Sequence, residues 1–397
     1  MNDNLLQSAG RLPRLRSLPL AAALALAACC AASAQTPIGA DELMPPAIRF
    51  VGAEVEISVK QSVVGRRYQL QQSDTLAPGS WVDVETERLG NGGPLVIATP
   101  RPVGVLKQFY RLALDPVSAV PAGFALIPGG SFLMGDQSDP PVGTADERPV
   151  HEVIVGAFYL AKYEVTKELW DEVRAWGLNN GYTDLPAGGG KAGNHPVHSI
   201  NWHAVVKWCN ARSQKEGLTP CYTVDGAIYK TLNKDNVVCD WGANGYRLPT
   251  EAEWEKAARG GAVGKNFPWG TDTISHSQAN YYSSTGYSYD VSPTRGYHPT
   301  YATGLPPYSS PVGSLAANGY GIYDMAGNMW EWCWDWHAAY TADAQTNPRG
   351  PASGSLRLIR GGNWSIQAEY ARCADRYLIM PDGAGNNLGF RLARSHL

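Results

Sequence analysis

The sequence carries little charge and has no excess of either sign. Its 33 lysine and arginine residues nearly balance 36 aspartate and glutamate residues, which gives a formal net charge of -3. Surfaces that bind nucleic acids usually carry a basic excess, so the composition argues against such a partner. The chain also contains no P-loop, dinucleotide fingerprint, H-E-x-x-H pair or G-x-S-x-G elbow. These absences remove the common signatures of nucleotide-binding proteins, zinc proteases and serine hydrolases.

Long periodic segments of the kind that form helical repeats or coiled coils are missing as well. The chain has 43 glycines and 28 prolines to interrupt regular structure, while 13 tryptophans and 20 tyrosines supply large side chains for packing. This composition is typical of a loop-rich fold held together by aromatic residues. At 397 residues the chain is long enough for two or three domains.

A long apolar run occurs only near the N-terminus. Three arginines precede an apolar stretch at residues 18–32, and the run closes with the small-residue sequence Ala32-Ser33-Ala34. Residues 1–34 therefore have the pattern of a cleaved export signal, and we expect a secreted, periplasmic or cell-envelope protein. Cys29 follows small residues and offers a second interpretation, in which lipidation at this cysteine anchors the chain to a membrane.

Five cysteines follow the predicted signal, and an odd number leaves at least one thiol unpaired. Export permits disulfides. The best candidate pair is Cys221 with Cys239, because these two residues bracket a predicted hairpin. Cys209 falls on the apolar face of a predicted helix, so we expect it in the core rather than in a metal site.

Residues 36–115 are predicted to form a separate small β module of the β-sandwich type. Glycine, proline, asparagine and aspartate divide this region into short runs with strand-like composition. The runs are Arg67–Gln71, Trp81–Val84, Leu95–Ile97 and Gln108–Leu112. No acid–base pair or ligand cluster stands out here, so a spacer or adhesive module is expected, joined to the rest of the chain by a linker at 115–121.

Three helices are predicted in the larger C-terminal region. Thr166 can cap a helix that runs to about Trp176, and apolar residues at helical spacing indicate a second helix from Trp202 to about Ser213. The clearest signal is a capping box formed by Thr250 and Glu253. It predicts a helix start at this point without pointing to any chemistry.

Residues 318–336 carry the most distinctive pattern in the chain. Four tryptophans recur at every second position from Trp330 to Trp336, which is the period of a β-strand. Upstream, Asp324 and Asn328 are turn-forming residues with side-chain oxygens, so the stretch is either a packed aromatic strand or a strand beside a hard-cation site. The preceding residues 261–314 form a long loop, and such loops are usually functional, clamped by a cation or poorly ordered.

Five motifs in the same order resemble the sulfatase-modifying-factor family, whose best-known member is the formylglycine-generating enzyme. They are Ile127–Gly135, Tyr246–Trp254, Asn318–Trp332, Arg360–Trp364 and Leu388–Arg391. The resemblance covers about residues 122–395 and not the N-terminal module. It implies an α+β fold that is low in regular secondary structure, related to C-type lectins and often stabilised by calcium.

The family enzyme oxidises a cysteine of a client sulfatase with molecular oxygen and a copper(I) ion held by two thiolates. Counted from Gly362 without gaps, the two thiolate positions are Ile366 and Ala371 in this sequence, and neither side chain can bind copper. Tyr370 stands where the family has an active-site tyrosine. Cys373 resembles a later family cysteine that forms a disulfide, but its partner position is Ala258. Copper is therefore not expected.

Two calcium sites follow from the resemblance. The first comprises Gly327, Asn328, Met329 and Glu331, in the family's G-N-x-W-E segment. The second is a weaker match and comprises Asn280, Tyr281 and Asp290. Both sets offer the oxygen ligands that calcium prefers.

Two functions remain open at this point. One is an exported, calcium-stabilised binding or scaffold module, without formylglycine chemistry, whose partner is an extracellular protein, peptide or glycan. The other is an oxidoreductase of the same superfamily that acts on a protein or small molecule with a different metal. The residues to test for the second function are Tyr370, Arg372, Cys373 and Arg376. The structural alternative for the last three is a buried thiol and arginines that pair with Asp375 or other carboxylates.

Overall fold

The computed structural model describes residues 47–51, 54–59, 67–74, 82–84, 88–89, 94–100, 109–114 and 120–396. The chain divides into two compact units, residues 1–116 and 117–397, and each is described by itself. The predicted export signal and Cys29 lie outside the described residues. Within those residues, no helix combines the length and the apolar character needed to cross a membrane.

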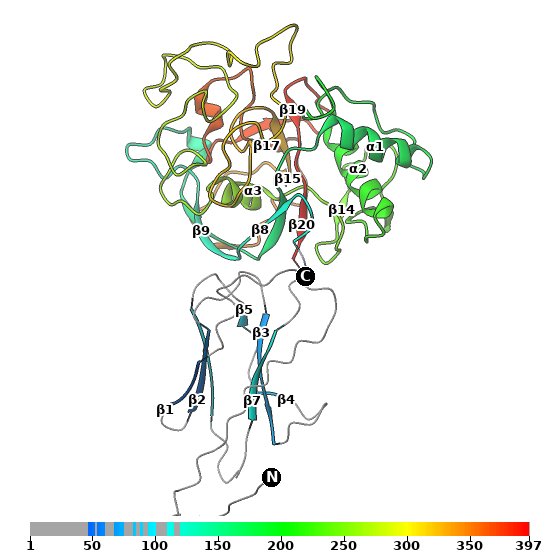
Figure 1. The fold of residues 1–397 in the computed structure, drawn as a ribbon. Helices are drawn as coiled ribbons and strands as arrows, with labels where there is room; N and C mark the ends of the chain where they lie inside the picture. The colour runs from blue at the N-terminus through cyan, green and yellow to red at the C-terminus, as the bar shows by residue number, and fades with distance from the viewer. Residues whose placement is uncertain are drawn as a thin grey trace, which may run out of the picture. The chain divides into compact units, whose positions relative to one another are not determined.

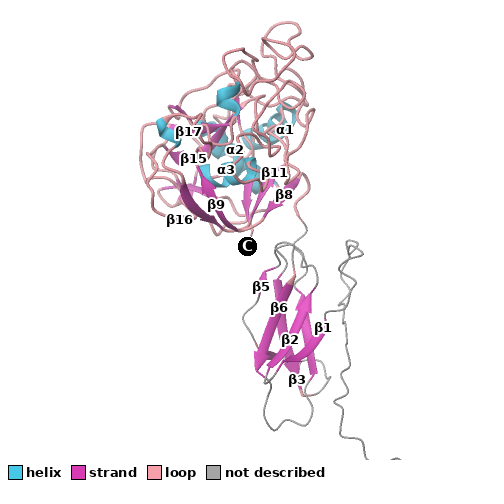
Figure 2. Ribbon diagram, turned by 90° about the vertical axis from the view of Figure 1, so that its left-hand side faces the viewer, coloured by secondary structure: helices cyan, strands magenta, loops and turns pink. Residues whose placement is uncertain are grey.

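The N-terminal unit contains two antiparallel sheets. One has the strand order β1-β2-β6, and the other has the order β4-β3-β5 with β7 also paired to β3 (Figure 2). Its strands are β1 (Ala47–Val51), β2 (Glu54–Val59), β3 (Arg67–Ser73), β4 (Val82–Asp83), β5 (Arg88–Leu89), β6 (Leu95–Pro100) and β7 (Phe109–Leu114). Buried residues of both sheets, Val55, Ile57, Tyr68, Leu70, Ile97 and Tyr110, form one apolar cluster. The four predicted runs coincide with β3, β4, β6 and β7, whereas β1, β2 and β5 were not predicted.

The C-terminal unit combines short strands, three α-helices and long connecting loops (Figure 1). The strands before the third helix are β8 (Phe124–Ile127), β9 (Gly130–Met134), β10 (His151–Val155), β11 (Phe158–Ala161), β12 (Tyr222–Val224), β13 (Ala227–Ile228) and β14 (Val238–Cys239). The later strands are β15 (Trp330–Trp336), β16 (Gln345–Thr346), β17 (Arg357–Arg360), β18 (Tyr377–Ile379), β19 (Leu388–Gly389) and β20 (Ala393–Ser395). Short 3-10 helices span Ala145–Glu147 and Ala368–Ala371.

All three predicted helices are present. Helix α1 (Lys167–Leu178) is capped by the Thr166 side chain, and α2 (Trp202–Lys215) is capped by Asn201. Helix α3 (Glu251–Ala258) begins at the predicted capping box, with both of its reciprocal hydrogen bonds formed. Helices α1 and α2 pack together through Trp170 and Trp208, whose rings are stacked at 5.5 Å. Cys209 is fully buried in the same cluster, so its predicted core position is confirmed.

Strand β15 is the central strand of the C-terminal core. It lies between β17 and β19 in a four-stranded sheet of order β18-β17-β15-β19. Trp330 and Trp332 belong to the apolar cluster that includes α1 and α2, whereas Cys333 belongs to the cluster that includes α3. The predicted strand is confirmed. It is buried on both faces, so the residues between the tryptophans also need partners inside the protein.

The predicted disulfide between Cys221 and Cys239 is not formed. All five cysteines in the described part of the chain are free. In the hairpin that these two residues bracket, the residue opposite Cys239 is Tyr222. Cys221 precedes β12 and is not paired with Cys239 across the strands, although both thiols are buried in the same apolar cluster. Burial also raises the pKa of Cys221 to about 11, so this thiol stays protonated and reacts slowly.

Several deeply buried charges of the C-terminal unit form ion pairs. Arg391 from the C-terminal segment meets Glu331 of β15, with Nε to Oε2 at 2.6 Å and Nη2 to Oε1 at 2.5 Å. The indole nitrogen of Trp254, on α3, donates to the same carboxylate at 2.7 Å. Arg391 also donates to the main-chain oxygens of Ala161 and Tyr323 at 3.2 and 3.0 Å. One guanidinium therefore joins three segments that are distant in sequence.

Replacing Arg391 by methionine is expected to destabilise the protein by about 3–5 kcal/mol, because Glu331 would remain buried without its cation. Urea unfolding at neutral pH measures the change. The matched control is Lys265→Met, which breaks a half-exposed pair with Asp272 and should cost less than about 1 kcal/mol. Equal losses in the two variants would contradict the importance assigned to the buried pair.

Candidate binding face

The segment that carries the family's copper positions turns back on itself directly after β17. Gly361 and Gly362 both have positive φ angles, of 97° and 72°. A Cβ atom on Gly362 would lie 2.9 Å from the carbonyl oxygen of Tyr370, so only glycine allows this close approach. The double glycine thus sets where residues 363–371 lie.

Aromatic side chains gather around this segment. We define the aromatic face as Tyr282, Tyr297, Tyr308, Trp330, Trp364, Tyr370 and Tyr377. Trp330 stacks on Tyr377 at 5.3 Å and meets Tyr370 edge-on at 6.1 Å. Trp364 contacts Tyr308 at 5.3 Å and Tyr297 at 5.8 Å between ring centroids. Tyr297 and Tyr377 are 41% and 45% exposed, so part of the face is open to solvent.

Main-chain hydrogen bonds fix the face in place. The Tyr282 amide donates to the Ile366 carbonyl at 3.0 Å, and the Trp364 amide donates to the Asn328 carbonyl at 3.0 Å. The long loop 261–314 is thereby tied to the segment after β17. Lys191 adds a positive charge beside the face, 5.8 Å from the Tyr308 ring centroid. Its ammonium also donates to the main-chain oxygens of Tyr301 and Thr303.

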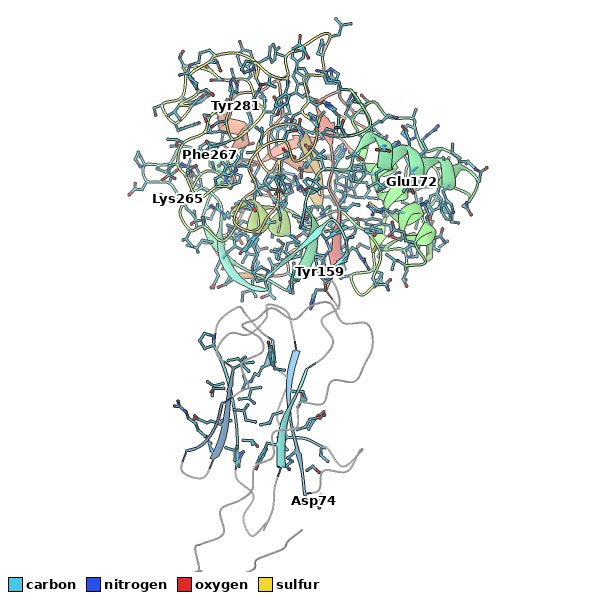
Figure 3. The ribbon with its side chains drawn as sticks, in the orientation of Figure 1. Asp74, Tyr159, Glu172, Lys265, Phe267 and Tyr281 are labelled. Carbon is cyan, nitrogen blue, oxygen red and sulfur yellow. The ribbon has the colours of Figure 1, made fainter. Side chains whose placement is uncertain are left out.

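The two copper positions are occupied by packing residues. Ala371 is buried in a small apolar cluster with Phe267 and Tyr281, and Figure 3 labels these two aromatic residues in the loop-rich part of the unit. Ile366 is partly buried and packs against the main core. Cys373 is 1% exposed, and burial raises the pKa of its thiol to about 12. A thiol in this state is a poor source of the thiolate that copper(I) needs.

Of the four candidate residues for oxidoreductase chemistry, Tyr370 alone belongs to the aromatic face. Arg372 makes a bidentate pair with Glu147 at 2.6 and 2.7 Å, and Arg376 makes one with Glu251 at 2.6 and 3.0 Å. Both arginines are buried. These geometries match the structural alternative, in which Arg372 ties its loop to the 3-10 helix at Ala145–Glu147 and Arg376 ties its loop to α3.

The first predicted calcium set contains residues with other partners. Both oxygens of Glu331 accept hydrogen bonds from Arg391. The Asn328 side chain accepts from the Ser310 amide at 2.9 Å and donates to Glu164 at 2.6 Å. Glu164 also accepts from the Met329 amide at 3.0 Å. A calcium ion on this segment would have to share Glu331 with the guanidinium.

Two further carboxylates lie beside this set, and sequence reasoning missed one of them entirely. Burial and the neighbouring Asp324 and Glu331 charges raise the pKa of Glu164 well above its usual value. Burial raises the pKa of Asp324 to about 6, although the hydrogen bond from the Gly313 amide partly offsets this increase. Glu164 and Asp324 thus lie close to Glu331, and their raised pKa values show that the interior disfavours three ionised carboxylates beside the single guanidinium of Arg391. Glu164 carried no sequence signal, because it is 160 residues or more from its partners along the chain.

The second predicted calcium set is also engaged. Asp290 accepts from the Tyr281 hydroxyl at 2.6 Å and from Ser283 at 2.9 Å, and Arg295 lies 3.1 Å from the same carboxylate. The Asn280 side-chain oxygen, by contrast, is buried without a hydrogen-bond partner. In the described ranges, no group of three histidine, cysteine, aspartate or glutamate side chains converges as a metal site would.

Comparison with known proteins decides the family. A model of the sulfatase-modifying factor enzyme 1-like domain matches residues 113–396. The chain belongs to this family. The predicted resemblance is confirmed, and with it the α+β fold of the C-terminal unit.

Members of the family carry different names. The chain is 34% identical over 277 residues to the chaperone protein LppX of Paenibacillus barcinonensis, which covers 68% of this chain and 88% of the relative. It is 33% identical over 297 residues to the formylglycine-generating enzyme of Bos taurus, covering 70% and 76%. Among solved structures, Treponema denticola variable protein 1 is 31% identical with a TM-score of 0.53, covering 71% of this chain and all of that one. Membership alone therefore does not specify the activity.

Asp324 gives a pH-dependent prediction. Its pKa in the folded protein is about 6, above the usual 3.8, so its contribution to stability is present below about pH 4 and lost as the pH rises through 6. In a chelating buffer at pH 7.5, Asp324→Asn should therefore be more stable than the parent by about 1–3 kcal/mol. Asparagine tolerates the positive φ of 57° at this position.

Urea unfolding at a series of pH values provides the measurement. The stability difference between variant and parent should shrink as the pH falls from 7.5 to 4 and approach zero below about pH 3, where Asp324 is protonated in both states. A difference that stays constant from pH 4 to 7.5 would contradict the assignment.

Proposed function

We propose that this protein is an exported binding or scaffold module of the sulfatase-modifying factor family that does not generate formylglycine. The observation that carries the proposal is the identity of the residues at the copper positions, Ile366 and Ala371, within a segment that is surrounded by the aromatic face. The aromatic face therefore lies at the place where the family's formylglycine chemistry would occur.

The remaining cysteines support this reading. Cys333 and Cys373 are the two that could be imagined as a replacement pair, and both are buried in the apolar cluster around α3. Burial raises the pKa of both thiols. Neither is placed where a client chain at the surface would meet its sulfur, so a relocated copper site is not supported.

The aromatic face suits recognition of an extracellular protein, peptide or glycan. Tyrosine and tryptophan supply large contact areas with few rotatable bonds, and each also carries a polar atom. One relative is named as a chaperone, which is a binding role, and this agrees with the proposal. The N-terminal β unit would then act as a spacer between the face and the cell surface. We place the protein in the secreted, periplasmic or cell-envelope fraction, with lipidation at Cys29 as the second choice.

The proposal predicts that the aromatic face carries the binding. Screening the exported chain against arrays of glycans, peptides and envelope proteins should yield a specific ligand. Tyr297 and Tyr377 are the two most exposed residues of the aromatic face. Each of the variants Tyr297→Ala and Tyr377→Ala should lower the affinity for that ligand by about tenfold or more, as expected for aromatic contacts. Ile154→Ala is the matched control, because Ile154 is 42% exposed on β10.

Three results would count against the proposal. Equal losses in the control and face variants would remove the face from recognition, and failure to bind any partner would remove the binding role. Stoichiometric copper or iron in the natively purified protein, with oxygen uptake on a client peptide, would favour the oxidoreductase. Tyr370 is the residue of this face that such an enzyme could use.

We include calcium in the proposal because Glu164 and Asp324 lie close to Glu331, and a divalent cation would offset the repulsion between these carboxylates. Glu331 would then be shared between the cation and Arg391. The Asn280 side-chain oxygen is an unpartnered acceptor nearby, and the amide nitrogen of the same side chain donates to the Asn328 side-chain oxygen at 3.4 Å.

Calcium is expected to raise the melting temperature of the parent protein relative to a chelating buffer, by about 4 °C or more at concentrations well above the dissociation constant. Asp324→Asn should lose most of this increase, because it removes one carboxylate from the cluster. Differential scanning calorimetry in the two buffers makes the comparison. Identical melting temperatures for the parent with and without calcium would show that Arg391 alone balances the cluster.

A further inference from the structure

A cavity of about 300 Å³ lies beside α3, with no residue in common with the aromatic face. Strand β9 and the residues that follow α3 form much of its wall. The apolar part of the wall comes from Phe132, Leu133 and Val263, and Tyr320 and Gln137 add polar groups. Val263 is 77% exposed, so the cavity can be reached from solvent at this residue.

Lys256 lines this cavity from α3 and has an uncommon environment for a lysine. The residue is only 6% exposed. Its ammonium donates to the main-chain oxygen of Gly130 and lies 5.8 Å from the centroid of the Phe132 ring. Among the described ion pairs, which extend to 4.0 Å, none involves Lys256. Burial lowers the pKa of Lys256 to about 8.

The other charged groups at the cavity do not offer an anion site. The Arg259 guanidinium is committed to Glu255, at 2.7 Å, and to the main-chain oxygens of Gly135 and Lys265. Glu152, from β10, contributes a negative charge to the wall. A phosphate or carboxylate ligand would therefore find one weakly charged amine and an acidic neighbour. An uncharged molecule with an apolar body fits the wall better.

We propose that Lys256 and this cavity form a covalent-capture site for small apolar aldehydes. The unprotonated amine of Lys256 attacks the carbonyl carbon, which gives a carbinolamine. The two amine protons then leave with the carbonyl oxygen as water, and an imine remains. No electrons are transferred and no oxidant is needed. The apolar wall holds the aldehyde body and limits access of water to the imine.

The amount of free amine is what distinguishes Lys256 from the other lysines. At pH 7.5, a lysine with a pKa of about 8 is roughly 200-fold richer in the unprotonated form than an ordinary lysine with a pKa near 10.4. Lys265 is the natural comparison, because it lies nine residues away, is half exposed and pairs with Asp272 at 2.6 Å. Figure 3 labels Lys265 in the same loop-rich part of the unit.

Trapping with benzaldehyde and cyanoborohydride tests the proposal on the full chain. Peptide mass spectrometry should find Lys256 benzylated at least about 20-fold faster than Lys265 at pH 7.5. This rate ratio is set below the ratio of unprotonated amine between the two lysines. The labelling rate should rise to its half-maximum near pH 8. Lys256→Arg should remove the fast label, and Lys265→Arg should leave it unchanged.

Because Lys256 lies on α3, its replacement could disturb the helix, so a second variant leaves Lys256 unchanged. Val263→Trp fills the cavity from an exposed position and leaves Lys256 in place, so it should slow labelling of Lys256 by about tenfold or more through lost access. Equal labelling of Lys256 and Lys265 would overturn the proposal. So would a rate at Lys256 that keeps rising to pH 10, or one that Val263→Trp does not change.

Discussion

Buried pairs between arginines and carboxylates are the constraint on which the C-terminal unit depends. Strand β15 and helix α3 both bring carboxylates into the interior, as Glu331 and Glu251 show. A buried carboxylate without a partner is costly, so each requires a cation from another part of the chain. Arg391 and Arg376 meet this requirement from the C-terminal third. Each pair joins segments that are distant in sequence. Formation of the pairs therefore also fixes the positions of the loops between those segments.

This dependence explains how the chain can keep its shape while its surface chemistry changes. The turn after β17 needs its two glycines, and the pairs beneath it need their arginines, but neither requires a sulfur at position 366 or 371. Ile366 and Ala371 fill those places as apolar packing residues. The aromatic face around them is fixed by main-chain hydrogen bonds and ring contacts, which are independent of copper. The fold of this segment therefore does not depend on a thiolate at either position.

Local signals in the sequence were reliable where short-range physics governs. The caps of α1 and α3 and the alternating tryptophans of β15 each produced the predicted element, because capping and side-chain alternation act within a few residues. Long-range pairing was harder to predict. The predicted Cys221–Cys239 bridge is not formed, and Glu164 contacts Asn328 from a place in the sequence with no motif.

The sequence by itself determined the family, the helix starts and the central strand, because each depends on residue identity at known spacing. The tertiary structure alone decided which charges meet. It placed Arg391 on Glu331 and Arg372 on Glu147, gathered the tyrosines of the loop beside Trp364, and put Lys256 at an apolar cavity without a carboxylate partner. Such contacts join residues tens to hundreds of positions apart, and their energies depend on burial, which no local pattern encodes.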